Sequence, residues 1–237
     1  MNVLNGRPVI KAVVFDLDGL MLNTEDIFDL AGRQLLNRRG MQMTEQIHRS
    51  MLGRRPDEAF QAMKDLTGIT DRIEDLKSET RELFAEIAAH HLAMMPGLLE
   101  LLDLIEERNL PKAVATSSPR DYLLDMLTRF DLLHRFPLTL TAEDVTHGKP
   151  HPEIYLSAAT QLSVDPANVL VLEDSETGTR AAASAGAFTV SVPNQHTHRG
   201  DFSMTSLLAR SLSDPQLLGL LAPSVQTARV QETGGVQ

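Results

Sequence analysis

Acidic residues follow two apolar segments of this chain, at positions where carboxylate chemistry could take place. The first segment ends in Asp16, and Asp18 comes two residues later. The second ends in Glu173, and Asp174 follows directly. A segment that is apolar along its whole length is typical of a central strand in a parallel sheet, and open α/β sheets bind ligands at the carboxyl ends of such strands. We therefore expect these four carboxylates to meet at one edge of a sheet.

Four carboxylates in one place repel one another, and they stay ionised together only beside a cation. A hard cation that prefers oxygen ligands, Mg²⁺ above all, is the natural partner for such a group. The sequence therefore predicts Mg²⁺ as the cofactor. The candidate metal ligands are Asp16, Asp18, Glu173 and Asp174.

Composition limits the class of protein. At 237 residues and 26.1 kDa, the chain can bury a sizeable core as one large domain or two modest ones. The net charge of −10 argues against a nucleic-acid partner, which needs a basic stripe, although a locally positive site for an anionic substrate is compatible with it. No apolar run approaches the ~20 residues of a membrane span, and no apolar signal core precedes Val13. We therefore expect no membrane partner, and the absence of cysteine suits a cytoplasmic protein.

The chain contains a purely helical stretch, followed by a stretch in which helices and strands alternate. Residues 24–92 contain helical apolar patterns and no strand candidate comparable with residues 12–16. From Pro96 onward, expected helices alternate with expected strands, at residues 112–117, 138–141, 169–173 and 188–192. Such alternation implies right-handed βαβ crossovers and a parallel sheet.

This order of elements predicts an α/β fold with a Rossmann-like, doubly wound parallel sheet and an inserted all-helical cap domain. The catalytic core is expected to comprise residues 1–21 and 93–222, and the cap residues 22–92. A single larger α/β domain with a helical excursion is the alternative, but the strand-free stretch is long enough to bury a small core of its own. Residues 223–237 lack apolar periodicity and are expected to form a tail.

Four short motifs, in a fixed order along the chain, resemble those of the haloacid dehalogenase superfamily. They are FDLDGLMLNTE at 15–25, ATSS at 115–118, GKPHP at 148–152 and LEDS at 172–175. Each lies at an expected strand end or in the loop after one, and the resemblance covers about residues 10–195. The likeness is greatest to the branch with a helical cap, which includes β-phosphoglucomutase and many small-metabolite phosphatases.

The resemblance implies a role for each core residue. Asp16 would be a nucleophile that forms an acyl-phosphate, which splits one difficult displacement into two easier steps. Asp18 would protonate the leaving oxygen and then activate the hydrolytic water, while its backbone carbonyl would ligate the metal. Mg²⁺ would bridge Asp16 and the phosphate, and Asp174, with Glu173 beside it or acting through water, would complete the ligands.

Phosphate ligands are implied in the second and third motifs. Thr116 would offer its hydroxyl, Ser117 its backbone amide and Lys149 its positive charge. For Lys149, the alternative is a solvated surface lysine. Ser118 before Pro119 also predicts a helix start with Ser118 as the N-cap, and a helix N-terminus itself favours anions.

In the expected cap, Gly53, Arg54 and Arg55 resemble a substrate-specificity loop of this branch. Either arginine could hold a second anionic or polyol part of the substrate, and a solvated pair of arginines at a helix start is the equal alternative. The mutase has a histidine four residues after the threonine that corresponds to Thr24, whereas this chain has Phe28. The resemblance therefore favours a phosphatase over a mutase.

Together these features predict a Mg²⁺-dependent phosphoric monoester hydrolase that acts on a small phosphorylated metabolite, a sugar or nucleoside phosphate, through an aspartyl-phosphate. A sugar phosphomutase of the β-phosphoglucomutase type is one alternative. A non-catalytic metabolite-binding or regulatory protein is another, because a fold alone does not give function. The intact set of site residues argues against the non-catalytic protein. We expect a monomer, with a dimer as the alternative.

Overall fold

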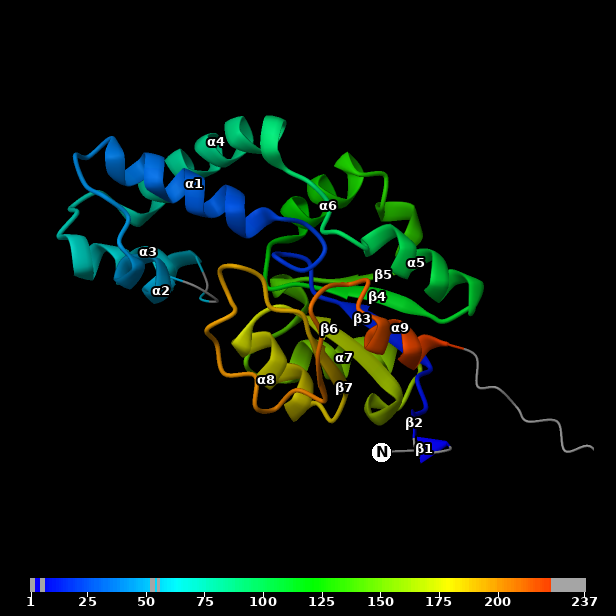
Figure 1. The fold of residues 1–237 in the computed structure, drawn as a ribbon. Helices are drawn as coiled ribbons and strands as arrows, with labels where there is room; N and C mark the ends of the chain where they lie inside the picture. The colour runs from blue at the N-terminus through cyan, green and yellow to red at the C-terminus, as the bar shows by residue number, and fades with distance from the viewer. Residues whose placement is uncertain (1–2, 5–6, 52–53, 55, 223–237) are drawn as a thin grey trace, which may run out of the picture.

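The computed structural model of the protein describes residues 3–4, 7–51, 54 and 56–222. Figure 1 shows a twisted sheet flanked by helices, with a further group of helices set to one side. The α/β fold expected from the sequence is therefore confirmed. The expected tail, residues 223–237, lies outside the described residues.

Six parallel strands form the central sheet, in the order β5-β4-β3-β6-β7-β8. Their bounds are Ala12–Phe15 (β3), Lys112–Ala115 (β4), Leu138–Leu140 (β5), Val169–Glu173 (β6), Phe188–Ser191 (β7) and Leu207–Leu208 (β8). The chain moves outward in both directions from the adjacent pair β3 and β6, where Phe15 is level with Leu172. The crevice at the carboxyl ends of these two strands is the topological switch point, where open α/β sheets bind ligands.

Two apolar clusters cover the two faces of the sheet. Successive residues of a strand point to opposite faces, so Ala12 and Val14 lie in one cluster and Val13 and Phe15 in the other. The first cluster includes α7 (Glu153–Gln161) and α8 (Glu176–Ser184), and the second includes α5 (Leu98–Glu107), α6 (Arg120–Arg129) and α9 (Pro215–Leu221). Coverage on both faces explains why these strands are apolar along their whole length.

The helices set to one side are α1 (Thr24–Asn37), α2 (Glu45–Met51), α3 (Pro56–Thr67) and α4 (Ile73–His91). α1 packs on α4, and α2 packs on α3. The structure describes no strand in its part of residues 24–92. The buried side chains of these helices belong to the same apolar cluster as one face of the sheet, so the small core expected for the cap is continuous with the larger one. Leu22 and Met94 pair where the two connections meet, which supports our proposed cap, residues 22–92.

Several short elements were not expected from the sequence. β1 (Val3–Leu4) and β2 (Arg7–Pro8) form a small antiparallel pair, and three 3₁₀ turns span Leu133–Arg135, Ala142–Asp144 and Pro166–Asn168. Elements of two or three residues are too short to show a period. Among the described residues, no helix combines the length and apolarity that crossing a membrane requires.

Candidate active site

Three carboxylates meet at the carboxyl ends of β3 and β6. Asp16 follows β3 and stays in register with the sheet, because its backbone N–H donates to the carbonyl of Leu172 at 3.0 Å. Glu173 ends β6 and Asp174 comes next. All three are buried, and each offers an oxygen within 4.8 Å of the others. The strand ends thus bring together three of the four carboxylates that were expected at one edge, and the side chain of Asp18 is not in this group.

Lys149 lies inside this acidic group. Its Nζ donates to Asp16 Oδ1 at 2.5 Å, to Glu173 Oε1 at 2.6 Å and to the carbonyl of Ala115 at 3.1 Å. The Lys149 side chain is only 6% exposed, so the alternative of a solvated surface lysine is wrong. Burial opposes the charge, but the carboxylates of Asp16 and Glu173 raise the pKa of Lys149 well above its ordinary value. A fixed positive charge therefore lies beside the proposed nucleophile.

Glu173 is held by hydrogen bonds on both carboxylate oxygens. Oε1 accepts from Lys149 and from the hydroxyl of Tyr155, and Oε2 accepts from the hydroxyl of Ser175 at 3.0 Å. The backbone of Gly178 approaches so closely that a Cβ there would stand 1.8 Å from Oε1. Direct ligation of a metal by Glu173 would compete with these donors. The geometry therefore favours Glu173 as the support of Lys149.

Asp18 occupies a separate part of the site. Its Oδ1 accepts from the hydroxyls of Thr24 at 2.9 Å and Tyr122 at 2.8 Å. Its Oδ2 accepts from the hydroxyls of Thr116 at 3.1 Å and Ser118 at 2.6 Å. The side chain thus stands apart from the three-carboxylate group, and the backbone carbonyl of Asp18 remains its proposed metal ligand. Two neighbouring carboxyl groups in such different surroundings suit a division between nucleophile and acid–base.

The loop after β4 differs from the prediction in one respect. Ser118 does not cap α6, because the helix begins at Arg120 with Pro119 in the cap position and no side-chain cap bond. The hydroxyl of Ser118 donates to Asp18 instead, and its backbone N–H donates to Thr116 Oγ1 at 3.0 Å. Ser117 is exposed at the tip of this loop, so its backbone amide remains a proposed phosphate donor.

Further residues of the site lie outside the four motifs. The side-chain amide of Asn194 donates to Asp174 Oδ2 at 2.8 Å and to the carbonyl of Gly19 at 3.1 Å, which links the two acidic loops. Asn194 follows β7, so its position as a polar residue after a buried strand could have indicated it. Tyr122 and Tyr155 lie within helices, among apolar neighbours, and no sequence signal marks them.

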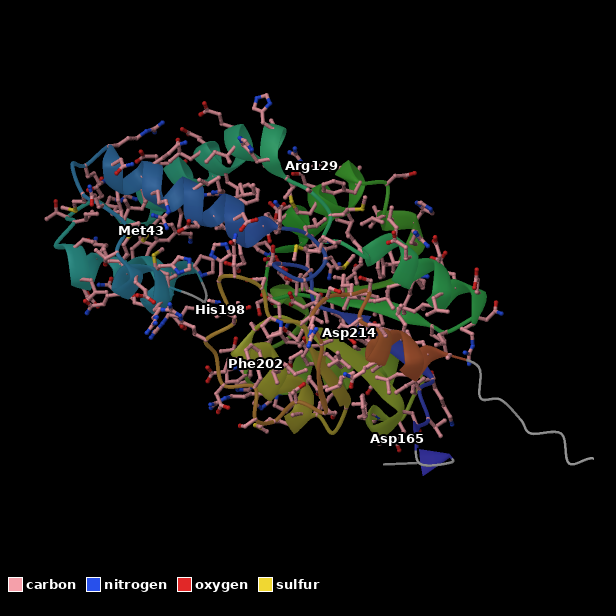
Figure 2. The ribbon with its side chains drawn as sticks, in the orientation of Figure 1. Met43, Arg129, Asp165, His198, Phe202 and Asp214 are labelled. Atoms are coloured by element: carbon pink, nitrogen blue, oxygen red, sulfur yellow. The ribbon has the colours of Figure 1, made fainter. Side chains whose placement is uncertain are left out.

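The cap residues are described in part. Gly53 and Arg55 lie outside the described residues, and Arg54 is exposed. The cap also meets the loop after β7, since Asp26 of α1 forms an ion pair with His196 at 2.6 Å. Figure 2 shows His198 of the same loop next to the cap helices. Contacts of this kind hold the cap over the carboxyl edge of the sheet.

A divalent cation fits the carboxylate group. Asp16 and Asp174 are 7% and 2% exposed, and burial together with the neighbouring negative charges raises the pKa of each. A bound cation would reverse that repulsion and keep both groups ionised. An all-oxygen donor set is the one Mg²⁺ prefers. The residues present therefore suit Mg²⁺, and Asp16 and Asp174 would be able to hold it.

Comparison with known proteins agrees with this site. The family model described as "Haloacid dehalogenase-like hydrolase" matches residues 13–192. A phosphorylated carbohydrates phosphatase of Thermotoga maritima is 34% identical over 177 residues, which are 75% of this chain and 82% of that protein. A validoxylamine A 7'-phosphate phosphatase of Streptomyces hygroscopicus subsp. limoneus is 35% identical over 194 residues, covering 78% and 87% of the two chains.

One solved structure is similar to this chain over most of the length of both proteins. The crystal structure of a HAD family hydrolase from Deinococcus radiodurans R1, with bound phosphate and sodium, has a TM-score of 0.74 and 25% identity. The match covers 92% of this chain and all of that one. The chain belongs to the haloacid dehalogenase-like hydrolases, as the four motifs predicted, and it is a hydrolase.

Proposed function

We propose that this hydrolase is a Mg²⁺-dependent phosphatase that acts on a small phosphorylated metabolite through an aspartyl-phosphate. One observation supports this most strongly. Asp16 lies 2.5 Å from the buried Lys149 ammonium, while Asp18, two residues further on, is held separately by four hydroxyl donors. One carboxylate is thus placed beside positive charge, as a nucleophile for an anion requires, and the other is free of the metal group, as an acid–base requires.

The reaction would run in two steps. In the first, a carboxylate oxygen of Asp16 forms a bond to phosphorus, the bond from phosphorus to the leaving oxygen breaks, and Asp18 gives that oxygen its proton. In the second, Asp18 takes a proton from water, and the water oxygen attacks phosphorus. The bond from phosphorus to the Asp16 oxygen breaks, so that inorganic phosphate leaves and the Asp16 carboxylate is restored. Lys149 stays charged throughout and attracts the phosphoryl oxygens.

Mg²⁺, when bound by Asp16, Asp174 and the backbone carbonyl of Asp18, would reduce the repulsion between the nucleophile and the phosphate. Thr116 and the amide of Ser117 would orient the phosphate. Removing the metal with a chelator should therefore stop turnover, and adding Mg²⁺ should restore it.

We propose a sugar or nucleoside phosphate as the substrate, and the names of the relatives support a sugar-like one. A phosphomutase is disfavoured by Phe28. The centroid of the Phe28 ring lies 4.5 Å from that of Phe84 and 6.2 Å from that of Tyr122, so Phe28 belongs to an aromatic cluster. Unlike a histidine, a phenylalanine side chain has no group that could exchange a proton. We also propose that the enzyme works as a cytoplasmic monomer, which size-exclusion chromatography would test in part.

The test is phosphate release across a panel of sugar, polyol and nucleoside phosphates, with and without Mg²⁺, using Asp16→Asn as the blank. We expect release that needs Mg²⁺ and disappears in the variant. Release by Asp16→Asn at a rate near that of the wild type would contradict the nucleophile. No release from any substrate, with conversion of a sugar phosphate in the presence of its bisphosphate, would favour the mutase.

A further inference from the structure

Tyr122 is the donor to Asp18 that belongs to none of the four motifs. It lies in the first turn of α6, and its hydroxyl is 2.8 Å from Asp18 Oδ1. A phenol is protonated at neutral pH, so the Tyr122 hydroxyl acts as the donor to this carboxylate oxygen. A hydroxyl at this distance constrains the direction in which the carboxylate points.

The ring of Tyr122 faces the cap. Its centroid lies 6.2 Å from that of Phe28 in α1 and 5.8 Å from that of Phe84 in α4. Phe28 and Phe84 are themselves 4.5 Å apart. We call these three rings the aromatic bridge. It connects two cap helices to a core helix, and rings at such distances attract one another beyond the effect of the area they bury.

The four donors to Asp18 divide between its two oxygens. Oδ2 accepts from Thr116 and Ser118, which both belong to the loop after β4 in the core. Oδ1 accepts from Thr24, the first residue of α1, and from Tyr122, whose ring contacts the cap. The position of Oδ1 therefore depends on where the cap lies, while the position of Oδ2 depends on the core.

We propose that Tyr122 is a positioning residue for Asp18, and that the aromatic bridge holds the Tyr122 ring so that its hydroxyl fixes Oδ1 toward the leaving oxygen. The inference rests on the proposed function, because it assumes that Asp18 protonates the leaving group.

Tyr122→Phe tests this, because it removes one oxygen atom and keeps the ring in the bridge. Protonation matters for an alkoxide leaving group, as in a sugar phosphate, and hardly at all for nitrophenolate. We expect the single-turnover rate of the first step to fall roughly tenfold to a hundredfold on the sugar phosphate, and the nitrophenolate burst to change less than about twofold. KM should change little on either substrate. Equal losses on both substrates would indicate a general packing defect and overturn the proposal.

A double-mutant cycle checks that Tyr122 acts through Asp18. In an Asp18→Asn background, Tyr122→Phe should cause no further loss, because the group that it positions has lost its proton-transfer function. An additional tenfold loss would mean that Tyr122 acts elsewhere. If the wild type releases no phosphate, or Asp16→Asn releases it normally, the proposed function has failed. If those controls behave and Tyr122→Phe matches the wild type on both substrates, this inference alone has failed.

Phe84→Leu tests the link to the cap, since it removes a ring of the bridge and leaves every hydroxyl in place. We expect the same selective loss on the sugar phosphate, smaller in size, and no added effect when it is combined with Tyr122→Phe. Equal slowing of both substrates by Phe84→Leu would contradict the coupling between cap and acid.

Discussion

The carboxyl edge of the sheet and the inserted helices hold their charged residues in different ways. At the edge, the side chains of Lys149, Asp16 and Glu173 are 6%, 9% and 0% exposed, and Lys149 bonds to both carboxylates. In the cap, Arg39 pairs with Asp71 and Glu79, and these three side chains are 19%, 37% and 21% exposed. Breaking a buried ion network leaves an uncompensated charge, whereas water replaces much of an exposed one. The edge therefore tolerates little change, and the cap can vary its residues to suit a substrate.

Lys149→Ala should have the largest effect. The change leaves Asp16 and Glu173 buried without their shared cation, and we expect the free energy of unfolding to fall by about 3–5 kcal/mol. Phosphate release should also stop. Urea unfolding at neutral pH, with the metal chelated, measures the loss of stability.

Lys112→Ala is the matched control for that prediction. Lys112 is also nearly buried on a strand, and it pairs with Glu106 at 2.8 Å. Glu106 keeps a second cation, because Arg135 lies 2.7 Å away. Lys112→Ala should therefore lower the free energy of unfolding by less than Lys149→Ala does, and it should leave turnover intact. Equal losses for the two lysines would contradict the distinction between a fully buried ion network and one whose carboxylate water can reach.

Glu25 lies at the boundary of the two regions, near the start of α1. Burial, and then the charges of Asp18, Asp26 and Asp29, raise the pKa of Glu25 from 4.5 to about 7. Between those values the folded protein binds a proton that the unfolded chain has lost, so Glu25 makes stability fall as the pH rises from 4.5 to 7.

Glu25→Gln removes this titration. It should flatten the fall in stability with pH and stabilise the metal-free protein above neutral pH by on the order of 1–2 kcal/mol. Thermal unfolding of both proteins at a series of pH values, with a chelator present, provides the comparison. Parallel pH profiles for the two proteins would show that Glu25 does not titrate in this range.

Arg55→Ala tests whether the expected specificity loop of the cap helps to select the substrate. If Arg55 holds a second polar part of the substrate, kcat/KM on the best metabolite should fall about tenfold, the effect of one lost hydrogen bond to a charged group. Hydrolysis of a minimal aryl phosphate should hardly change. Arg54→Ala, one residue away and exposed, is the matched variant. Equal losses by Arg55→Ala on both substrates would exclude a role in specificity.

Arg39→Ala should have the smallest effect. Its partners in the cap remain accessible to water, so we expect a loss of about 1 kcal/mol in unfolding free energy and no change in kcat. Arg33→Ala serves as the reference, because the Arg33 side chain is 53% exposed, against 19% for Arg39, and pairs with Asp29 within α1. A loss for Arg39→Ala as large as that for Lys149→Ala would remove the distinction between the two regions.

The sheet and the acidic edge could be predicted because their signals lie in consecutive residues. The apolar run ending in Glu173 predicted β6 with its observed bounds. β8 and α9 were missed: β8 has two residues, and α9 has seven. β8 is defined by its pairing with β7, and α9 by its packing near α5. Both are contacts between distant parts of the chain, which a local sequence pattern cannot show.

The support of the site was harder to predict. Ser118 has the sequence of an N-cap, yet the nearby Asp18 carboxylate takes its hydroxyl because a charged acceptor forms the stronger bond. Tyr122 and Tyr155 reach the site from helices, where they follow the same spacing as core residues. Which hydroxyl meets which carboxylate depends on how α6 and α7 pack on the sheet, and that is a tertiary property.

The most direct test of the account is to look for the phosphoryl group on Asp16. A substrate labelled in its phosphate is mixed with the enzyme and Mg²⁺, the reaction is quenched within one turnover, and the protein is digested for peptide mapping. We expect the label on the peptide that contains Asp16 in the wild type, and on no peptide in Asp16→Asn. Label on a different residue, or phosphate released without any labelled protein at the earliest times, would contradict Asp16 as the nucleophile.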